Sequence, residues 1–124
     1  MRVRIAVVAA VVTLGSTGAA MAVSQATPPK LKGTVGPGFT ISLKDSKGKK
    51  VKTLKAGKYT FVVKDKADIH NFYIEKQKGG TYHKKITTIP GKGTKTVVIK
   101  LTKGKYKYYC QAHESAMFGF ITVN

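Results

Sequence analysis

Cys110, His113 and Met117 fall within eight residues near the C-terminal end of the 124-residue chain. Two residues separate the cysteine from the histidine, and six separate it from the methionine. A turn of this length can point a thiolate, an imidazole and a thioether into one small space. A fourth candidate, His70, lies 40 residues before Cys110 in an apolar segment predicted to form a strand.

Together these four side chains make up the ligand set of one kind of metal centre. A thiolate and two imidazoles, with a weak thioether, are typical of blue copper electron-transfer sites. Thiolate and thioether favour Cu(I) and imidazole also serves Cu(II), so an intermediate geometry allows redox change with little rearrangement. We therefore expect one copper per chain, cycling between Cu(I) and Cu(II), with the ligands His70, Cys110, His113 and Met117.

Each of these residues also has a simpler explanation when taken alone. A lone cysteine is more often a small buried apolar residue, and a lone methionine often fills space in a core. A lone histidine is commonly a strand or loop residue without a ligand role. The metal hypothesis therefore depends on the combination. His83, which lies among polar residues, is interpreted as a solvated loop residue.

Residues 1–22 have the features of a secretory signal peptide. Two arginines precede a ten-residue apolar stretch, residues 5–14, and small residues lead to an Ala20-Met21-Ala22 cleavage motif. Ten apolar residues are too few to cross a bilayer, which needs roughly 20. We expect cleavage near Ala22, no membrane span, and a secreted, periplasmic or cell-envelope location.

The charge of the remaining chain comes almost entirely from lysine. Removal of residues 1–22 takes away both arginines and leaves 21 lysines against five acidic residues. This composition predicts acidic partners, either an acidic redox protein or an anionic cell-envelope surface. Without arginine or a nucleic-acid motif, specific nucleic-acid recognition is not expected. Few carboxylates and one cysteine argue against acid–base or disulfide chemistry, and we expect a monomer that is not an enzyme.

The pattern of apolar residues predicts an all-β domain. Residues 23–32 are polar with two prolines and are interpreted as an N-terminal leader, which leaves residues 33–124 for the domain. Apolar residues there alternate with polar ones, and no segment has a sustained helical period. Seven to eight short strands in two layers are expected, with a single turn over residues 111–118. The alternating segments are 39–44, 51–54, 58–63, 69–75, 96–101, 106–110 and 121–123.

The sequence resembles the cupredoxins, particularly plastocyanin-like and pseudoazurin-like small secreted bacterial proteins. The similarity covers residues 33–124 and rests on IHNFYI around His70 and on YYCQAHESAMFGFITV, with VGPGFTISL and LKAGKYTFVV as weaker matches. It implies a two-sheet Greek-key β-sandwich with His70, Cys110, His113 and Met117 as copper ligands. It further implies that Asn71 joins the two ligand loops near the thiolate. Gly119 matches the glycine that follows the methionine by two residues.

Two departures from the family pattern concern the ligand loop. Ala112 stands where relatives often have proline, and three residues lie between His113 and Met117 where plastocyanins usually have four. The axial bond from Met117 is therefore the least secure of the four contacts.

Several functions are compatible with this sequence. The leading hypothesis is a secreted one-electron carrier that releases its electron through an exposed edge of His113. The surrounding patch is expected to be poor in lysine and to comprise residues 36–38, Ala112, Ala116 and Phe118. The alternatives are copper storage or delivery at the cell surface, and a cationic binding module with a cupredoxin-like fold but no copper. Nucleophilic catalysis by Cys110 and His113 is a weaker alternative.

Overall fold

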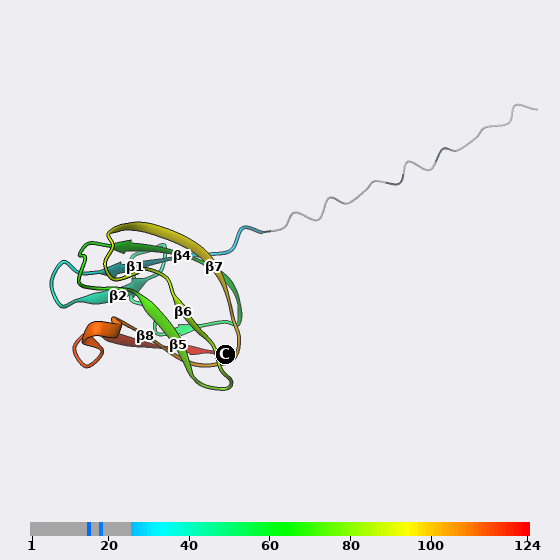
Figure 1. Ribbon diagram of the computed structural model, residues 1–124. Coiled ribbons are helices and arrows are strands. Elements are labelled where there is room, and N and C mark those ends of the chain that lie inside the picture. The colour runs from blue at the N-terminus through cyan, green and yellow to red at the C-terminus, as the bar shows by residue number, and fades with distance from the viewer. Residues whose placement is uncertain (1–14, 16–17, 19–25) are drawn as a thin grey trace, which may run out of the picture.

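The computed structural model describes residues 15, 18 and 26–124, and it shows a two-layer β-sandwich (Figure 1). The predicted signal peptide and its cleavage point lie outside the described residues, apart from residues 15 and 18. No helix within the described part is both long and apolar enough to cross a membrane. The elements are β1 (Lys30–Val35), β2 (Ile41–Lys44), β3 (Thr53–Leu54), β4 (Gly57–Asp65), β5 (Tyr73–Lys78), β6 (His83–Lys85), β7 (Gly93–Leu101), β8 (Gly104–Tyr109), the 3-10 helix η1 (Gln111–His113) and β9 (Phe118–Val123).

One layer is a four-stranded sheet in the order β2-β1-β4-β7, and the other is a five-stranded sheet in the order β3-β9-β8-β5-β6. Most neighbours are antiparallel, but β1 pairs with β4 and β3 pairs with β9 in parallel. Both sheets are therefore mixed. The parallel pairs arise because the chain crosses between the layers before it returns to each sheet.

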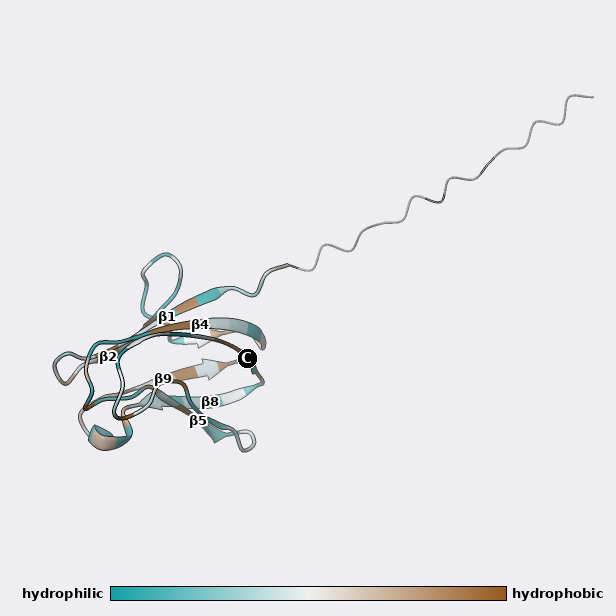
Figure 2. Cartoon of the chain, turned by 45° about the horizontal axis from the view of Figure 1, so that its top comes forward, coloured by the Kyte–Doolittle hydropathy of each residue, from teal (hydrophilic) through white to brown (hydrophobic). Residues whose placement is uncertain are grey.

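Alternation of apolar and polar residues decides which side of each sheet faces the core. In β4, Tyr59, Phe61 and Val63 are buried, and the residues between them are more exposed. Buried and more exposed residues alternate along β1 as well, and Figure 2 shows alternating hydrophilic and hydrophobic segments on this strand. Since successive strand residues point to opposite faces, each sheet contributes one apolar face to the shared core.

The sequence prediction of a two-layer all-β sandwich is confirmed, and its details change in three places. The structure has nine strands within its described part, because each of the seven expected segments overlaps one strand and β1 and β6 are additional. β1 begins at Lys30, so the last three residues of the predicted leader form a strand. β5 begins at Tyr73, which leaves His70 in the connection before the strand. In that connection, side chains replace ladder partners, because the Phe72 N–H bonds to Thr87 and the Asn71 side chain bonds to Gln111.

His83 differs from its predicted setting. It is exposed, as expected, but it begins β6 and does not lie in a loop. Its ring stacks on Tyr73, with the two centroids 6.1 Å apart. The short strand was not recognised because its sequence, His-Lys-Lys, has no apolar alternation.

Gly119 is required by close packing in the core. It lies opposite Tyr108 in the β8–β9 pair, and a Cβ atom there would be 2.2 Å from the Tyr108 ring. A side chain at this position would push a fully buried tyrosine into neighbouring core residues.

We predict that Gly119→Ala lowers the free energy of unfolding by about 1–3 kcal/mol, because overpacking displaces the Tyr108 ring. Chemical denaturation of the copper-free protein measures this effect. Gly38→Ala is the matched control, since a Cβ at residue 38 has no neighbour within 4 Å. Equal stability of the two variants would contradict the packing argument.

Candidate metal centre

Two loops at one end of the sandwich carry the candidate ligands. His70 lies in the β4–β5 connection, and Cys110 opens the β8–β9 connection that contains η1 (Figure 1). The Cys110 N–H donates to the Met117 carbonyl at 3.0 Å, and the His113 N–H donates to the Cys110 carbonyl at 3.1 Å. These bonds close residues 110–117 into a compact turn, as the sequence predicted for this segment.

Three potential ligand atoms converge in this space. The Nδ1 atoms of His70 and His113 are 3.2 Å apart. The Cys110 Sγ lies 3.8 Å from Nδ1 of His70 and 3.6 Å from Nδ1 of His113. His70 and Cys110 are fully buried, while His113 is partly exposed. The cluster is therefore closed to solvent on all but the His113 side.

These separations fit a single metal ion. Bonds of about 2.0 Å to nitrogen and about 2.3 Å to sulfur, at tetrahedral to trigonal angles, place ligand atoms roughly 3.3–3.7 Å apart. The three observed distances agree with that range within about 0.1 Å. One thiolate with two imidazoles is also the donor set that suits copper in an electron-transfer site. The cluster can accordingly hold one copper ion.

Packing orients the His70 ring. Its Nε2 is buried and has no hydrogen-bond partner in the described part of the chain, so no acceptor fixes the ring from behind. Gly36 approaches closely instead, because a Cβ there would lie 3.0 Å from the ring carbon Cδ2. The edge of Phe39 contacts both histidines, with centroid distances of 5.5 Å to His70 and 4.9 Å to His113. Phe39 is thus a site residue that its strand-like alternation in sequence did not reveal.

Asn71 joins the two ligand loops. Its Oδ1 accepts the Gln111 N–H at 2.8 Å, and its Nδ2 donates to the Gln111 Oε1 at 2.9 Å. Tyr73 is the register partner of Tyr109 in the antiparallel β5–β8 pair. If the ladder continued by two residues, Asn71 would be the partner of Gln111. The Asn71 side chain therefore replaces the missing backbone partner at the end of the sheet. Sequence reasoning missed Gln111, whose type alone carries no signal for this role.

The family described as copper binding proteins, plastocyanin/azurin family, matches residues 39–124. This chain belongs to that family. Among solved structures, auracyanin A, a blue copper protein of Chloroflexus aurantiacus, is 18% identical with a TM-score of 0.54 and covers 79% of this chain and 100% of its own. Reduced rusticyanin, a protein of Thiobacillus ferrooxidans, is 22% identical with a TM-score of 0.53 and covers 77% of this chain and 78% of its own.

The comparison with curated proteins gave no match. At these identities the two solved structures support the fold alone, and the family match supports copper as the cofactor. The sequence-based identification as a cupredoxin is confirmed.

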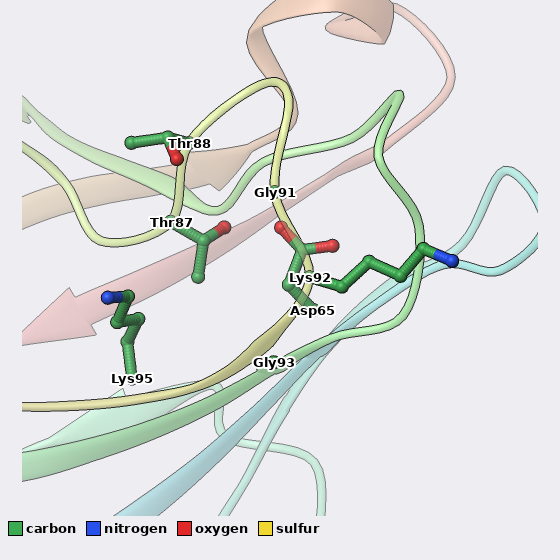
Figure 3. A pocket seen from close by; sticks show the side chains of 7 residues that line it. All are labelled: Asp65, Thr87, Thr88, Gly91, Lys92, Gly93 and Lys95. Carbon is green, nitrogen blue, oxygen red and sulfur yellow. The ribbon is translucent and has the colours of Figure 1, made fainter.

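In this cupredoxin, polar side chains hold both ends of the loop that carries His70. Asp65 is buried at the end of β4, and its Oδ1 accepts the Ala67 N–H at 3.1 Å. At the other end, the Phe72 N–H donates to the Thr87 Oγ1 at 2.8 Å. Asp65 and Thr87 line the same small cavity, and the Asp65 carboxylate points into it (Figure 3). The base of the loop is thereby connected to the segment that follows β6.

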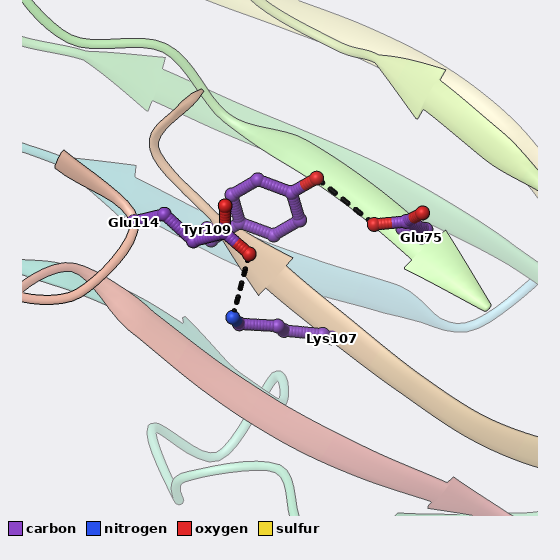
Figure 4. Close-up of polar contacts among 4 residues, drawn as sticks. All are labelled: Glu75, Lys107, Tyr109 and Glu114. Carbon is purple, nitrogen blue, oxygen red and sulfur yellow. Dashed lines mark hydrogen bonds and ion pairs between the residues drawn. The ribbon is translucent and has the colours of Figure 1, made fainter. Parts of the chain in front are cut away.

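The strand that leads to Cys110 is covered on its outer side by a polar and aromatic cluster. The Tyr109 hydroxyl donates to the Glu75 Oε2 at 2.9 Å, and the Lys107 ammonium pairs with Glu114 at 2.8 Å (Figure 4). Burial, followed by the hydrogen bond to Glu75 and its negative charge, raises the pKa of Tyr109 above its ordinary value. Tyr109 therefore stays a neutral hydrogen-bond donor near neutral pH. The Lys107–Glu114 pair also fixes the residue after His113 to β8.

Met117 is buried beside the cluster. Its N–H donates to the His113 carbonyl at 2.9 Å, and its carbonyl accepts the Cys110 N–H. The main chain thus places residue 117 directly next to two of the three converging residues. Its role as an axial ligand stays a prediction, as do the ligand roles assigned to the other three residues. His83, which was not expected to bind metal, lies outside the converging cluster.

We predict that Asn71→Ala lowers the free energy of unfolding by about 1–3 kcal/mol, because it leaves the Gln111 N–H without its acceptor. Copper release to a chelator should also become faster, since the two ligand loops are no longer joined. A double-mutant cycle with Gln111→Ala isolates the side-chain pair. Additive effects of the two substitutions would show that the loops are held together by other contacts.

Proposed function

We propose that this protein is a secreted blue copper protein that carries one electron at a time between partner proteins. The observation that supports this most directly is the convergence of the His70, Cys110 and His113 donor atoms. The proposed ligands are these three residues with Met117 as a weak axial donor. Copper, when bound there, supplies a one-electron Cu(I)/Cu(II) couple.

The surroundings suit a carrier more than an enzyme. Cys110, His70 and Met117 are buried, and each is at most 1% exposed to solvent. With Met117 as the proposed fourth donor beside the three converging residues, no open coordination position would be left for a substrate, in contrast to catalytic metal sites. The Asn71–Gln111 bonds and the Lys107–Glu114 pair hold the loops rigid, so little rearrangement accompanies a change of charge at the centre.

The partly exposed His113 is the proposed point of electron exit. Ala112 and Ala116 flank it and are exposed, and Phe39 is 60% exposed while its ring contacts both histidines. A small apolar surface of this kind permits close and brief contact with a partner. Gly36, which was expected to form part of this surface, is buried and instead packs on His70.

Lysine approaches this surface more closely than the sequence suggested. The Lys107 ammonium lies 5.2 Å from the centroid of the Phe118 ring, and Phe118 is 47% exposed. Charged groups therefore border the exit patch on the side of β8 and β9. They would orient an acidic redox partner while the apolar residues make the contact.

Copper storage or delivery at the cell surface is the second candidate function. It uses the same three converging residues, but it requires that copper passes readily to an acceptor. Deep burial of two of these residues favours slow release and thus the carrier. A cationic module without copper is disfavoured because the donor atoms of His70, Cys110 and His113 converge at metal-binding distances.

We predict that Cu(II) binds one per chain and produces an intense blue colour from charge transfer between the Cys110 thiolate and the metal. Cys110→Ser should bind copper weakly and without colour, because a hydroxyl lacks the soft, covalent donor. Visible absorption during a copper titration of the copper-free protein measures both. His83→Ala is the control and should keep the colour, because that histidine lies outside the cluster. A colourless wild-type protein would disprove the proposed function.

We predict that Ala116→Glu slows electron transfer to a redox partner by about tenfold or more, because a charge on the exit patch hinders close docking. The blue absorption should be nearly unchanged, since residue 116 offers no ligand. Stopped-flow oxidation by a partner cupredoxin or cytochrome measures the rate. Ala56→Glu is the matched control, because the Ala56 N–H bonds to the Asn124 carbonyl at the opposite end of β9. Equal slowing in both variants would exclude His113 as the exit.

A further inference from the structure

The outer face of the four-stranded sheet is covered by lysines. Its outward positions contain no aspartate or glutamate, and the one acidic residue of these strands, Asp65, is buried and points into the small cavity beside Thr87. The interspersed residues are mainly threonines. We call this surface the lysine face, and its lysines are Lys30, Lys32, Lys44, Lys58, Lys64 and Lys100.

Four of these lysines oppose one another directly across strand pairs. Lys32 is the register partner of Lys44 between β1 and β2, and Lys58 is the partner of Lys100 between β4 and β7. Like charges directly opposite on one face of a sheet destabilise the pairing. Neither of the ion pairs in the described part of the chain includes a residue of the lysine face. The free protein therefore bears this repulsion without compensation.

The outer face of the five-stranded sheet is built differently. There Lys107 is the register partner of Glu75, and its ammonium also pairs with Glu114 (Figure 4). The Lys105 ammonium lies 4.4 Å from the centroid of the Phe120 ring. Lys105 and Lys107 thus have an aromatic ring or a carboxylate beside them, although Lys78 is the register partner of Lys105 where β5 and β8 end. The two sheets therefore differ in their acidic residues, because the lysine face has none at its outward positions whereas Glu75 lies opposite Lys107 on the five-stranded sheet.

The lysine face also contains a shallow groove of about 300 Å³. Lys30 and Lys32 of β1 and Lys64 of β4 line it, together with the hydroxyl-bearing residues Thr34 and Thr94. Ammonium groups and hydroxyls along one depression can bind carboxylates and sugar hydroxyls at the same time. The groove therefore suits an extended chain that carries both kinds of group.

We propose that the lysine face binds a linear acidic polysaccharide. The acid-free surface and the opposed lysine pairs supply the charge complementarity, and the groove supplies a path for a chain. A bilayer fits less well, because surfaces that insert into the interface present large apolar or aromatic side chains. Among the described outward positions of these four strands, the apolar residues are only Val62 and Val98.

The position of this face allows both activities at once. Val35 ends β1 next to Gly36, which contacts His70, so the metal centre lies at the end of the strands and not on the face of the sheet. A polymer bound along the lysine face would leave His113 and its apolar surroundings free. Binding to such a polymer would hold the protein in an acidic matrix while its redox end stays accessible.

The test is calorimetric titration with sodium polygalacturonate, a linear polymer of carboxylated sugars, and with neutral dextran as the uncharged control. Binding of polygalacturonate should weaken steeply between low salt and about 0.15 M salt, as expected when bound counterions are released. The quadruple variant Lys32→Gln, Lys44→Gln, Lys58→Gln and Lys100→Gln should lose about tenfold or more in affinity. Its melting temperature should be equal to or above that of the wild type, because two repulsive pairs are removed.

A second quadruple variant, Lys55→Gln, Lys78→Gln, Lys85→Gln and Lys103→Gln, removes the same number of charges outside the lysine face. It should lose no more than about threefold in affinity for polygalacturonate. Equal loss in both variants would overturn the proposal, since binding would then follow net charge alone. Binding to vesicles with 30% phosphatidylglycerol but not to polygalacturonate would also overturn it, and so would a lower melting temperature of the first variant. Cys110→Ser should bind the polymer like the wild type, which separates this test from the copper function.

Discussion

The register between β5 and β8 is the constraint on which the metal centre depends. Tyr73 lies opposite Tyr109, and this single alignment brings the loop before β5 next to the turn after β8. A shift by one residue would exchange the faces of the strand and move Ile74 out of the core. Stacking between Phe72 and Tyr108, with centroids 5.5 Å apart, opposes such a shift from inside the sandwich. The position of His70 relative to Cys110 is therefore set by core packing.

Beyond the last backbone hydrogen bond between the strands, side chains accept hydrogen bonds from the backbone N–H groups. Asn71 satisfies the Gln111 N–H, and Thr87 satisfies the Phe72 N–H, both at places where the backbone has already left the ladder. The Phe72 amide is buried and the Gln111 amide is partly buried, and an unpaired buried amide costs about 1–3 kcal/mol. The loops of the site are consequently as well determined as the strands. This rigidity is what a centre needs if it is to change charge without changing shape.

The two outer faces of the sandwich show how differently one composition can be distributed. The acidic residues Glu75 and Glu114 are placed beside Lys107 on one face. On the other face, lysines meet lysines across the strands. Net charge alone describes neither arrangement. A uniform coat of lysine would serve solubility, whereas a face without acidic residues on one sheet and a face that carries Glu75 on the other indicate separate tasks.

The sequence by itself determined the chemistry and the class of fold. The spacing of Cys110, His113 and Met117 is local, and a short turn can bring such residues together whatever the rest of the chain does. Alternation of apolar and polar residues likewise predicts strands and a two-layer core, because successive side chains of a strand point to opposite faces of the sheet. The types of the four proposed ligands, and the resemblance of the surrounding motifs to the cupredoxins, could likewise be recognised from the sequence.

Only the tertiary structure decided which distant residues meet. Phe39 was predicted to lie in a strand, yet its ring contacts both histidines from a loop. Gln111 has no distinctive sequence signal, and the opposed lysines of the lysine face lie on strands whose pairing no local pattern encodes. The physical reason is that register and sheet order result from the packing of the whole core. Residues far apart in the chain become neighbours only when that packing is complete.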